Sequence, residues 1–225
     1  LLSRNSEREE YKADADDEWF PGATNAVVMY DRGTWDLECY PEATRSEEHT
    51  IEAFQSWAGP EDKIEQFYAD NAPELKAAAR KVGWRMPTST PGVPATNGLV
   101  ERMVRKCKVM AKTNRSQAGF HKSWWPYAMR HGTFSRRIAM VDGDSIYNKR
   151  HKGWHCKAKR IPFGAFVDYL PTPSPKEKKR SKDMCNRTRK GLFVGFHIQP
   201  GGLRSGDYLV VDWETLQNKP NATPD

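Results

Sequence analysis

The chain has 225 residues, enough for one large or two small domains that each bury a core. Apolar residues make up 37% and aromatic residues 11% of it, which excludes a chain that is disordered throughout. The net charge of +7 is unevenly distributed, because residues 1–90 have a net charge of −9 and residues 91–225 of +16. A basic half of this size is typical of proteins that bind a polyanion, although a solvated, charged surface has the same composition.

The sequence shows no zinc motif and no membrane segment. Its four cysteines are scattered without a C-x-x-C pair, and its six histidines have no ligand spacing with them, so reduced intracellular thiols are expected. No apolar run approaches the length of a membrane span, and no signal peptide is visible, so no membrane partner is expected. The chain begins without Met, which suggests a fragment of a longer protein.

The first 45 residues predict a tail followed by a pair of strands. Residues 1–10 are charged and predict a tail, and residues 11–17 have too little apolar content for more than a weak strand. An apolar run at 26–30 and an alternating run at 35–40 are separated by the sequence DRGT. This pattern is typical of a strand, a turn and a second strand.

The next segment alternates between helix and strand signals. Ser46 followed by two glutamates predicts a capped helix that ends before Gly59 and Pro60. Residues 63–69 alternate as a strand that places Asp70 at its carboxyl end, and residues 73–82 predict a helix that Gly83 closes. The expected order over residues 26–83 is therefore strand, strand, helix, strand, helix.

A Pro/Gly-rich loop at 89–97 then leads into a helix that Thr96 or Asn97 can cap. One stripe of this helix is apolar, and the stripe beside it carries one carboxylate, Glu101, followed by Arg105, Lys108 and Lys112. Two interpretations remain open. The helix is an ordinary amphipathic surface helix, or Glu101 binds a metal ion while the three basic side chains contact phosphates.

The last 100 residues predict a helix and then a small β module. Residues 123–140 look helical, and their aromatic side chains are expected in the core, with base stacking beside Arg130, Arg136 and Arg137 as the alternative. Short β runs between residues 155 and 215 predict the module. The polar, basic stretch at 171–190 predicts a loop whose basic run is a solvated face, a nuclear-import signal or a phosphate-binding arm.

Three pieces of the chain carry a family resemblance: YADNAPEL around Asp70, the Pro-rich loop, and NGLVERMVR opening the following helix. Together they resemble the integrase core of copia-type retrotransposon Pol polyproteins. The resemblance implies an α/β fold with a ribonuclease H-like mixed sheet of about five strands flanked by helices, followed by a small β-rich module. It implies the division into a tail (1–10), an integrase core (11–145), and a basic linker with the small β module (146–225).

The resemblance also implies a site of three carboxylates. Asp70 matches the second of these and Glu101 the third, and Asn71 and Asn97 match supporting positions. Asp14 is the best candidate for the first carboxylate, because KAD resembles the pattern of related elements, and Asp31 is the alternative. All three carboxylates are expected to be both catalytic and metal-binding, whereas Arg105, Lys108 and Lys112 are expected to bind DNA.

The implied function is DNA integration, in which Mg²⁺ or Mn²⁺ at a two-metal site assists trimming of retroelement 3′ ends and their transfer into target DNA. The implied partners are retroelement ends and the target duplex, with a possible homo-oligomer, and the implied location is the nucleus or a cytoplasmic retroelement particle. The alternatives are a catalytically decayed remnant that binds nucleic acid and a nuclease of the ribonuclease H type. Because the zinc-binding amino-terminal module of complete integrases is missing, the interpretation as a decayed remnant stays open.

Overall fold

A β-hairpin forms the centre of the amino-terminal half. The computed structural model describes residues 22–88, 98–153, 155–170 and 188–218. Strands β1 (Asn25–Tyr30) and β2 (Leu37–Glu42) are antiparallel, with Val28 opposite Cys39. Because neighbouring side chains of a strand point to opposite faces, Val27 and Met29 belong to one apolar cluster and Val28 to another. The hairpin therefore has a core on both of its faces.

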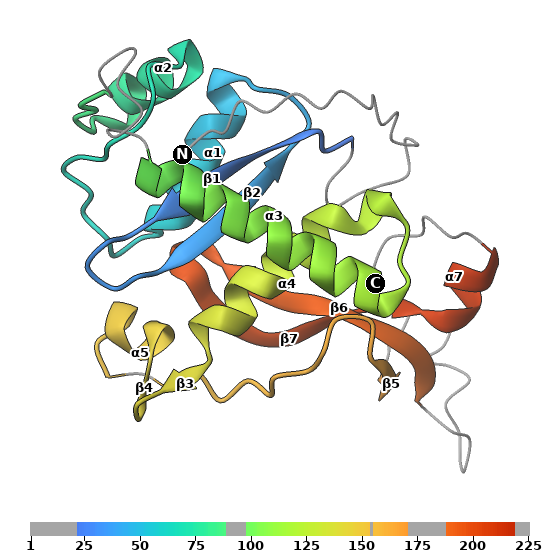
Figure 1. The fold of residues 1–225 in the computed structure, drawn as a ribbon. Helices are drawn as coiled ribbons and strands as arrows, with labels where there is room; N and C mark the ends of the chain where they lie inside the picture. Colours follow the sequence, from blue (N-terminus) through green and yellow to red (C-terminus); the bar gives the residue numbers. More distant parts are fainter. Residues whose placement is uncertain (1–21, 89–97, 154, 171–187, 219–225) are drawn as a thin grey trace, which may run out of the picture.

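Helix α1 (Glu47–Ala58) packs on one face of this hairpin, and α2 (Pro73–Val82) packs on α1 (Figure 1). Helix α1 begins where the Ser46 hydroxyl accepts a hydrogen bond from the His49 backbone N–H at 3.1 Å, and its first turn carries two glutamates. Helix α2 begins with proline and ends at Gly83, whose φ of 76° is the left-handed conformation that glycine adopts readily. Both helix boundaries follow the sequence signals.

The segment between α1 and α2 differs from the expected strand. Residues 63–69 form only two isolated parallel bridges, from Gln66 to Arg85 and from Ala69 to Thr88. Glu65 and Gln66 are exposed, and little apolar surface holds a longer ladder together. The α/β fold class expected from the sequence is confirmed, but the described residues show a two-stranded sheet and these bridges where about five strands were expected.

The opposite face of the hairpin is covered by α3 (Gly98–Ala118), which crosses in front of it in Figure 1. The predicted apolar stripe is buried, and Cys107 on α3 and Cys39 on β2 are both fully buried within this layer. A short 3-10 turn, η2 (Lys122–Trp124), leads into α4 (Trp125–Arg137). Trp124, Tyr127 and Phe134 are 3%, 5% and 1% exposed, so these aromatic side chains are core residues.

The carboxyl-terminal part forms a separate sheet that packs on α4. A short hairpin, β3 (Met140–Val141) with β4 (Asp144–Ser145), precedes α5 (Ile146–Arg150). Strands β5 (Phe166–Tyr169), β6 (Arg189–Gln199) and β7 (Leu203–Asp212) then form an antiparallel sheet, with η3 (Pro200–Gly202) between the last two strands and α7 (Trp213–Asn218) at the end. Val194 and Val211 share an apolar cluster with Val28, so this sheet and the hairpin pack around a common core.

Within the described residues, no helix combines the length and the apolar content that crossing a bilayer requires.

Candidate functional site

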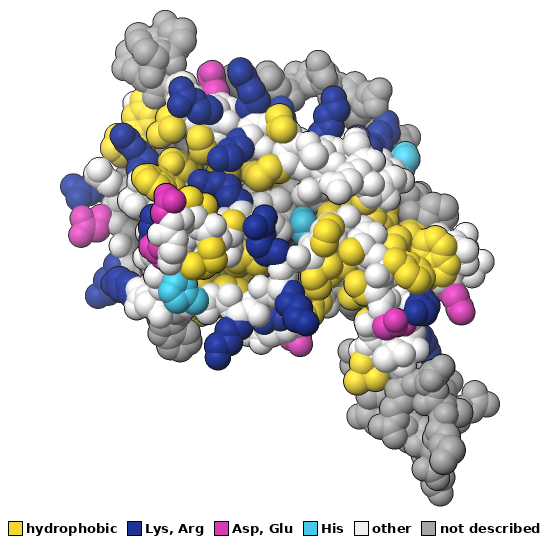
Figure 2. Space-filling view, turned by 60° about the horizontal axis from the view of Figure 1, so that its bottom comes forward, with side chains coloured by type: hydrophobic (Ala, Val, Ile, Leu, Met, Phe, Trp, Pro, Cys, Tyr) yellow, Lys and Arg dark blue, Asp and Glu magenta, His cyan; other side chains and the backbone are white. Residues whose placement is uncertain are grey.

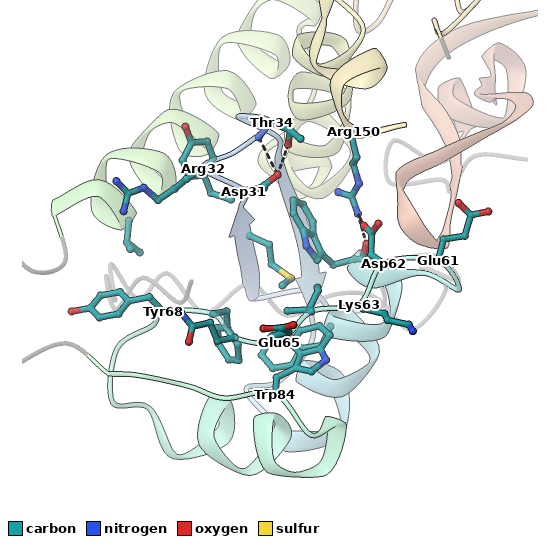
Figure 3. A pocket seen from close by; sticks show the side chains of 18 of the residues that line it. Asp31, Arg32, Thr34, Glu61, Asp62, Lys63, Glu65, Tyr68, Trp84 and Arg150 are labelled. Carbon is teal, nitrogen blue, oxygen red and sulfur yellow. Dashed lines mark hydrogen bonds and ion pairs between the residues drawn. The ribbon is translucent and has the colours of Figure 1, made fainter. Parts of the chain in front are cut away.

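A large cavity lies between the end of β1, the segment that follows α1, and the start of α3. Its volume is about 1180 Å³. Figure 3 shows the hairpin turn with Asp31, Arg32 and Thr34 on one wall, and Tyr68, Glu65 and Trp84 on the opposite wall. Leu99 and Val100 bring the first turn of α3 to the same cavity. The cavity thus lies between the hairpin turn, the segment 61–68 and the start of α3, each of which contains or adjoins a predicted site residue.

Aromatic side chains hold one wall of the cavity in place. Phe54 of α1 stacks on Trp84 with ring centroids 5.0 Å apart, and Phe67 meets both rings edge-on. This cluster connects α1 to the segments on either side of α2. Because the wall is packed through rigid rings, the backbone around residue 67 has a fixed position next to the cavity.

Asp70 lies three residues beyond Phe67, just after the bridge between Ala69 and Thr88. Its Oδ1 atom is buried and has no hydrogen-bond partner among the described residues. A buried carboxylate oxygen without a partner is unfavourable unless a cation or a donor approaches it. Of the predicted site residues, Asp70 is therefore the one whose surroundings best fit a cation ligand.

Glu101 is exposed and lies in the first turn of α3, one residue after Val100 at the cavity. Neither Asp70 nor Glu101 lines the cavity, but each is within two residues of a lining residue, Tyr68 and Val100 respectively. The described part of the chain contains no group of three or more His, Cys, Asp or Glu side chains arranged to hold a metal ion. Asp70 and Glu101 are among the described residues, whereas Asp14 is not, so the described structure does not contain all three predicted metal ligands.

Asp31, the alternative first carboxylate, has its oxygens engaged in the turn between β1 and β2. Its Oδ1 accepts the Gly33 backbone N–H at 2.9 Å, and its Oδ2 accepts the backbone N–H and the hydroxyl of Thr34 at 3.1 and 2.5 Å. These contacts are typical of a turn-forming aspartate. They leave the carboxylate less able to serve a metal ion than that of Asp70.

The structure gives no support for the roles of the remaining predicted site residues. Asp14 and Asn97 lie outside the described residues, so their roles stay predictions. Asn71 is exposed two residues before α2, and the described structure gives its side chain no contact that would support or exclude a role beside Asp70.

A buried ion network next to the cavity was missed at the sequence level. Arg137 on α4 is 1% exposed and donates to Asp36 at 2.6 Å and to Glu38. Arg150 on α5 donates to the other Asp36 oxygen at 2.6 Å and to Asp62 at 3.1 Å, and its guanidinium lies over the Trp57 ring. The signal in the sequence was the pair of carboxylates inside an apolar strand, since buried charges require partners.

The network fixes the charges of its members. Burial raises the pKa of Asp36, but the guanidinium groups of Arg137 and Arg150 outweigh burial and hold that pKa below its ordinary value. Burial lowers the pKa of Arg137, but Asp36 and Glu38 more than offset it and raise that pKa above its ordinary value. Arg137 is therefore a structural cation, buried with Asp36 and Glu38 and out of reach of a nucleic acid.

The basic side chains expected to bind DNA lie on the surface of α3. Arg105, Lys108 and Lys112 are exposed, and the last two line a second hollow that also reaches the start of β1. Figure 2 shows a different face of the molecule, over the carboxyl-terminal sheet, where dark blue Lys and Arg side chains outnumber the magenta acidic ones. The basic character predicted from the sequence is thus spread over the surface and is not confined to α3.

No protein-family model matches the chain. Among solved structures, the chain is similar to the catalytic core domain of HTLV-2 integrase in complex with magnesium (trimeric form), with 15% identity, a TM-score of 0.43, and coverage of 55% of this chain and 82% of that one. It is similar to the catalytic core domain of BIV integrase, with 15% identity, a TM-score of 0.42, and coverage of 56% and 86%. It is also similar to a chain of the simian T-cell lymphotropic virus intasome in complex with PP2A regulatory subunit B56 gamma, with 13% identity, a TM-score of 0.46, and coverage of 93% and 83%.

Proposed function

We propose that this chain cuts and joins DNA by metal-dependent polynucleotidyl transfer, as in the integration of retroelement DNA. The observation that carries the proposal is the buried, unpartnered Oδ1 of Asp70, next to a cavity that the start of α3 also lines. The motifs around Asp70 and Glu101, with their resemblance to copia-type integrase cores, supply the second argument. Phosphodiester transfer requires carboxylates at such a position to hold divalent cations.

Asp70 and Glu101 would hold Mg²⁺ or Mn²⁺, with Asp14 as the proposed third ligand. Hard cations prefer carboxylate oxygens, and the orphaned oxygen of Asp70 fits that preference. When bound, the metal ions would activate the attacking hydroxyl or water and stabilise the charge on the leaving oxygen. Asp31 is the weaker choice for the first carboxylate, because its oxygens already accept hydrogen bonds within the turn.

The basic side chains of α3 would hold the DNA. Arg105, Lys108 and Lys112 are exposed on the helix that Glu101 begins, so phosphates bound there would lie close to the metal site. Retroelement ends and target duplex are the proposed substrates, with assembly into a homo-oligomer. The proposed location is the nucleus or a cytoplasmic retroelement particle.

A second candidate function is nucleic-acid binding without chemistry. The observation that favours it is that the described residues contain no group of three or more His, Cys, Asp or Glu side chains arranged to hold a metal ion. A chain that has lost its first carboxylate would keep the fold and the basic helix. It would bind DNA without joining it.

The test is a strand-transfer assay with Mg²⁺ or Mn²⁺ on the unchanged chain and on the Glu101→Gln and Asp70→Asn variants. Each substitution keeps the shape of the side chain and removes its charge, so we expect joining to fall by at least about 100-fold. For Glu101→Gln, DNA affinity and the unfolding midpoint should stay nearly the same, because Glu101 is exposed. Glu65→Gln, which neutralises another exposed carboxylate at the cavity, is the matched control.

Each result has a defined meaning. Equal joining by Glu101→Gln and the unchanged chain would remove Glu101 from the site. An unchanged chain that binds DNA and yields no joined product with either metal would select the second candidate. Mn²⁺ binding, followed by paramagnetic broadening in both the unchanged and Asp70→Asn chains, reports the metal site without requiring activity.

A further inference from the structure

The second hollow in the structure is a groove between α3, the start of β1 and the start of α4. Its volume is about 420 Å³. Thr24, Asn25 and Ala26 form one side, and residues 104–115 of α3 form the other. This groove is distinct from the cavity next to Asp70, which meets α3 at its first turn.

The charge of the groove has one sign. The described residues that line it include five cations and no carboxylate, the cations being Arg45, Lys108, Lys112, Arg115 and Lys122. Arg45 donates to the amide oxygen of Asn25 at 3.0 Å, which holds its guanidinium over the start of β1. No carboxylate of the described chain forms an ion pair with Lys108, Lys112 or Arg115. An anionic occupant would therefore find several cations ready to receive it.

The floor of the groove is apolar. Val28, Val104, Cys107, Ala111, Trp125 and Met129 contribute to the lining between the basic side chains. Phosphate backbone alone does not use such a floor, whereas an acidic segment with aromatic side chains uses both the rim and the floor. The combination therefore favours an acidic peptide segment over nucleic acid.

The chain itself contains such a segment, which lies in the sequence a few residues before the ones that line the groove. Residues 16–20 read Asp-Asp-Glu-Trp-Phe, three carboxylates followed by two large aromatic side chains. They are connected through Pro21 to Gly22, two residues before Thr24 at the groove. Four residues of extended chain span at most about 14 Å, and residues 108–115 of a helix cover about 10 Å. The connection is therefore short enough to keep the segment at the groove and long enough to reach the α3 cations.

We propose that residues 16–20 of this chain occupy the basic groove, with Trp19 and Phe20 on the apolar floor and the three carboxylates against Lys108, Lys112 and Arg115. Because Lys108 and Lys112 are also the side chains proposed to contact DNA phosphates, the segment and DNA compete for the same cations. The segment thereby lowers the affinity of the chain for DNA in general, regardless of nucleotide sequence. This inference does not depend on catalysis.

Zero-length carbodiimide cross-linking of the intact chain tests the contact directly. We expect Asp16, Asp17 or Glu18 to be joined to Lys108 or Lys112, and mass spectrometry of tryptic peptides identifies the pairs. Cross-links from these carboxylates mainly to lysines far from the groove, such as Lys76 or Lys152, would overturn the proposal. So would the absence of any cross-link to the groove.

A mixture of ¹⁴N- and ¹⁵N-labelled chains shows whether the segment comes from the same molecule. We expect pairs of like label only. Pairs of mixed label would mean that a second copy supplies the segment, which would overturn the intramolecular form of the proposal. Excess duplex DNA should suppress the cross-links, and cross-links that persist with DNA bound would contradict the competition.

DNA affinity, measured by fluorescence anisotropy, supplies a second test. If the segment covers the groove about nine-tenths of the time, the variant Asp16→Asn/Asp17→Asn/Glu18→Gln should bind DNA about tenfold more tightly. Glu7→Gln/Glu9→Gln/Glu10→Gln removes the same charge from the same tail and is the matched control. An equal gain in both variants would reveal general repulsion between the tail and DNA, and would overturn the proposal.

Two further variants separate the contributions of the rim and the floor. Trp19→Ala changes no charge, so a gain in DNA affinity from it reports the apolar contact. In a Lys108→Gln/Lys112→Gln background, neutralising residues 16–18 should no longer change DNA affinity by more than about twofold, because the shared cations are gone. A full gain in that background would mean that the segment acts elsewhere.

Discussion

Asp36, just before β2, and Glu38, on β2, are 0% and 1% exposed, and their charges are matched by arginines from two later elements. Burying an ion pair costs solvation, and the arrangement is tolerable only because nearly every oxygen has a donor. Arg137 also donates to the Gly202 carbonyl at 3.3 Å. Single residues of this network therefore link β2 to α4, α5 and the carboxyl-terminal sheet.

Removing one member of the network should be costly. Arg137→Met keeps much of the volume but leaves Asp36 and Glu38 with too few cationic partners in the interior, so we expect the free energy of unfolding to fall by about 3–5 kcal/mol. Arg136→Met is the control, because among the described residues that neighbouring side chain donates to the Trp35 carbonyl alone, at 2.7 Å and at an exposed position. Urea denaturation of both variants measures the difference, and equal losses would show that the network contributes no more than a surface contact.

Glu42, at the end of β2, gives stability a pH dependence. Burial raises its pKa from the ordinary 4.5 to about 7, and both of its oxygens lack partners in the described structure. Because the folded chain holds this proton more tightly than the unfolded chain, the free energy of unfolding falls as pH rises from about 4.5 to about 7, and levels off above that range.

The expected size of this loss is at most about 3.5 kcal/mol, since one pKa unit corresponds to about 1.4 kcal/mol. Glu42→Gln should therefore be more stable than the unchanged chain at pH 8 and nearly equal to it at pH 4.5. Denaturation at several pH values measures how the difference in stability between the two chains changes with pH, with Glu61→Gln, at an exposed position, as the control. A constant difference between Glu42→Gln and the unchanged chain at all pH values would mean that Glu42 is ionised in the folded chain.

At the scale of elements, α3 presents three different surfaces along its length. Its first turn borders the cavity near Asp70, its buried stripe packs on the hairpin, and its exposed stripe carries basic side chains. The helix positions these surfaces relative to one another through its own periodicity. A substitution on the exposed stripe should therefore change binding while leaving the packing of α3 intact.

Neutralising Arg105, Lys108 and Lys112 to Gln should weaken DNA binding for every sequence alike. Each lost phosphate contact flattens the slope of log affinity against log salt by about 0.9, so three contacts flatten it by about 2.7. Titrations at several salt concentrations, in protein that also carries Glu101→Gln and Asp16→Asn/Asp17→Asn/Glu18→Gln, measure the slope without joining and without the acidic segment. An unchanged slope would show that this stripe is a solvated face only.

The helices were predictable because their signals are local. Ser46, Pro73 and Gly83 mark helix ends through their own backbone and hydrogen-bonding chemistry, and the stripe of α3 follows from spacing alone. The strand expected at 63–69 was not recovered as a full ladder, since pairing depends on distant partners that local alternation does not specify. The partners of Asp36 lie 101 and 114 residues away, so the network was beyond any local pattern.

At the scale of the molecule, the carboxyl-terminal sheet and the hairpin are held by common contacts. Phe134 and Phe196 pack with ring centroids 4.7 Å apart, which joins α4 to β6. Gly202 lies so close to Arg137 that a Cβ atom there would be 2.5 Å from the guanidinium nitrogen Nη1. The two parts should therefore unfold in one transition.

Gly202→Ala tests this coupling. The substitution combines a φ of 77° with the close approach to Arg137, and we expect the whole molecule to lose about 1–3 kcal/mol. Gly206→Ala has a positive φ and no heavy atom within 4 Å of the added Cβ, so it measures the backbone strain alone. Fluorescence and circular dichroism should give one coincident curve for each variant, and two separated transitions would show that the parts unfold independently.

The buried cysteine pair between β2 and α3 can report on local opening of the structure, because these thiols react only when they become exposed. Burial raises the pKa of Cys39 well above its ordinary value and that of Cys107 to about 12, so neither thiol forms the reactive thiolate at neutral pH. Cys156 is only partly buried and lies outside this layer. A pulse of alkylating reagent should therefore modify Cys156 in the folded chain, whereas alkylation of Cys39 and Cys107 would record how often the helix lifts away from the hairpin.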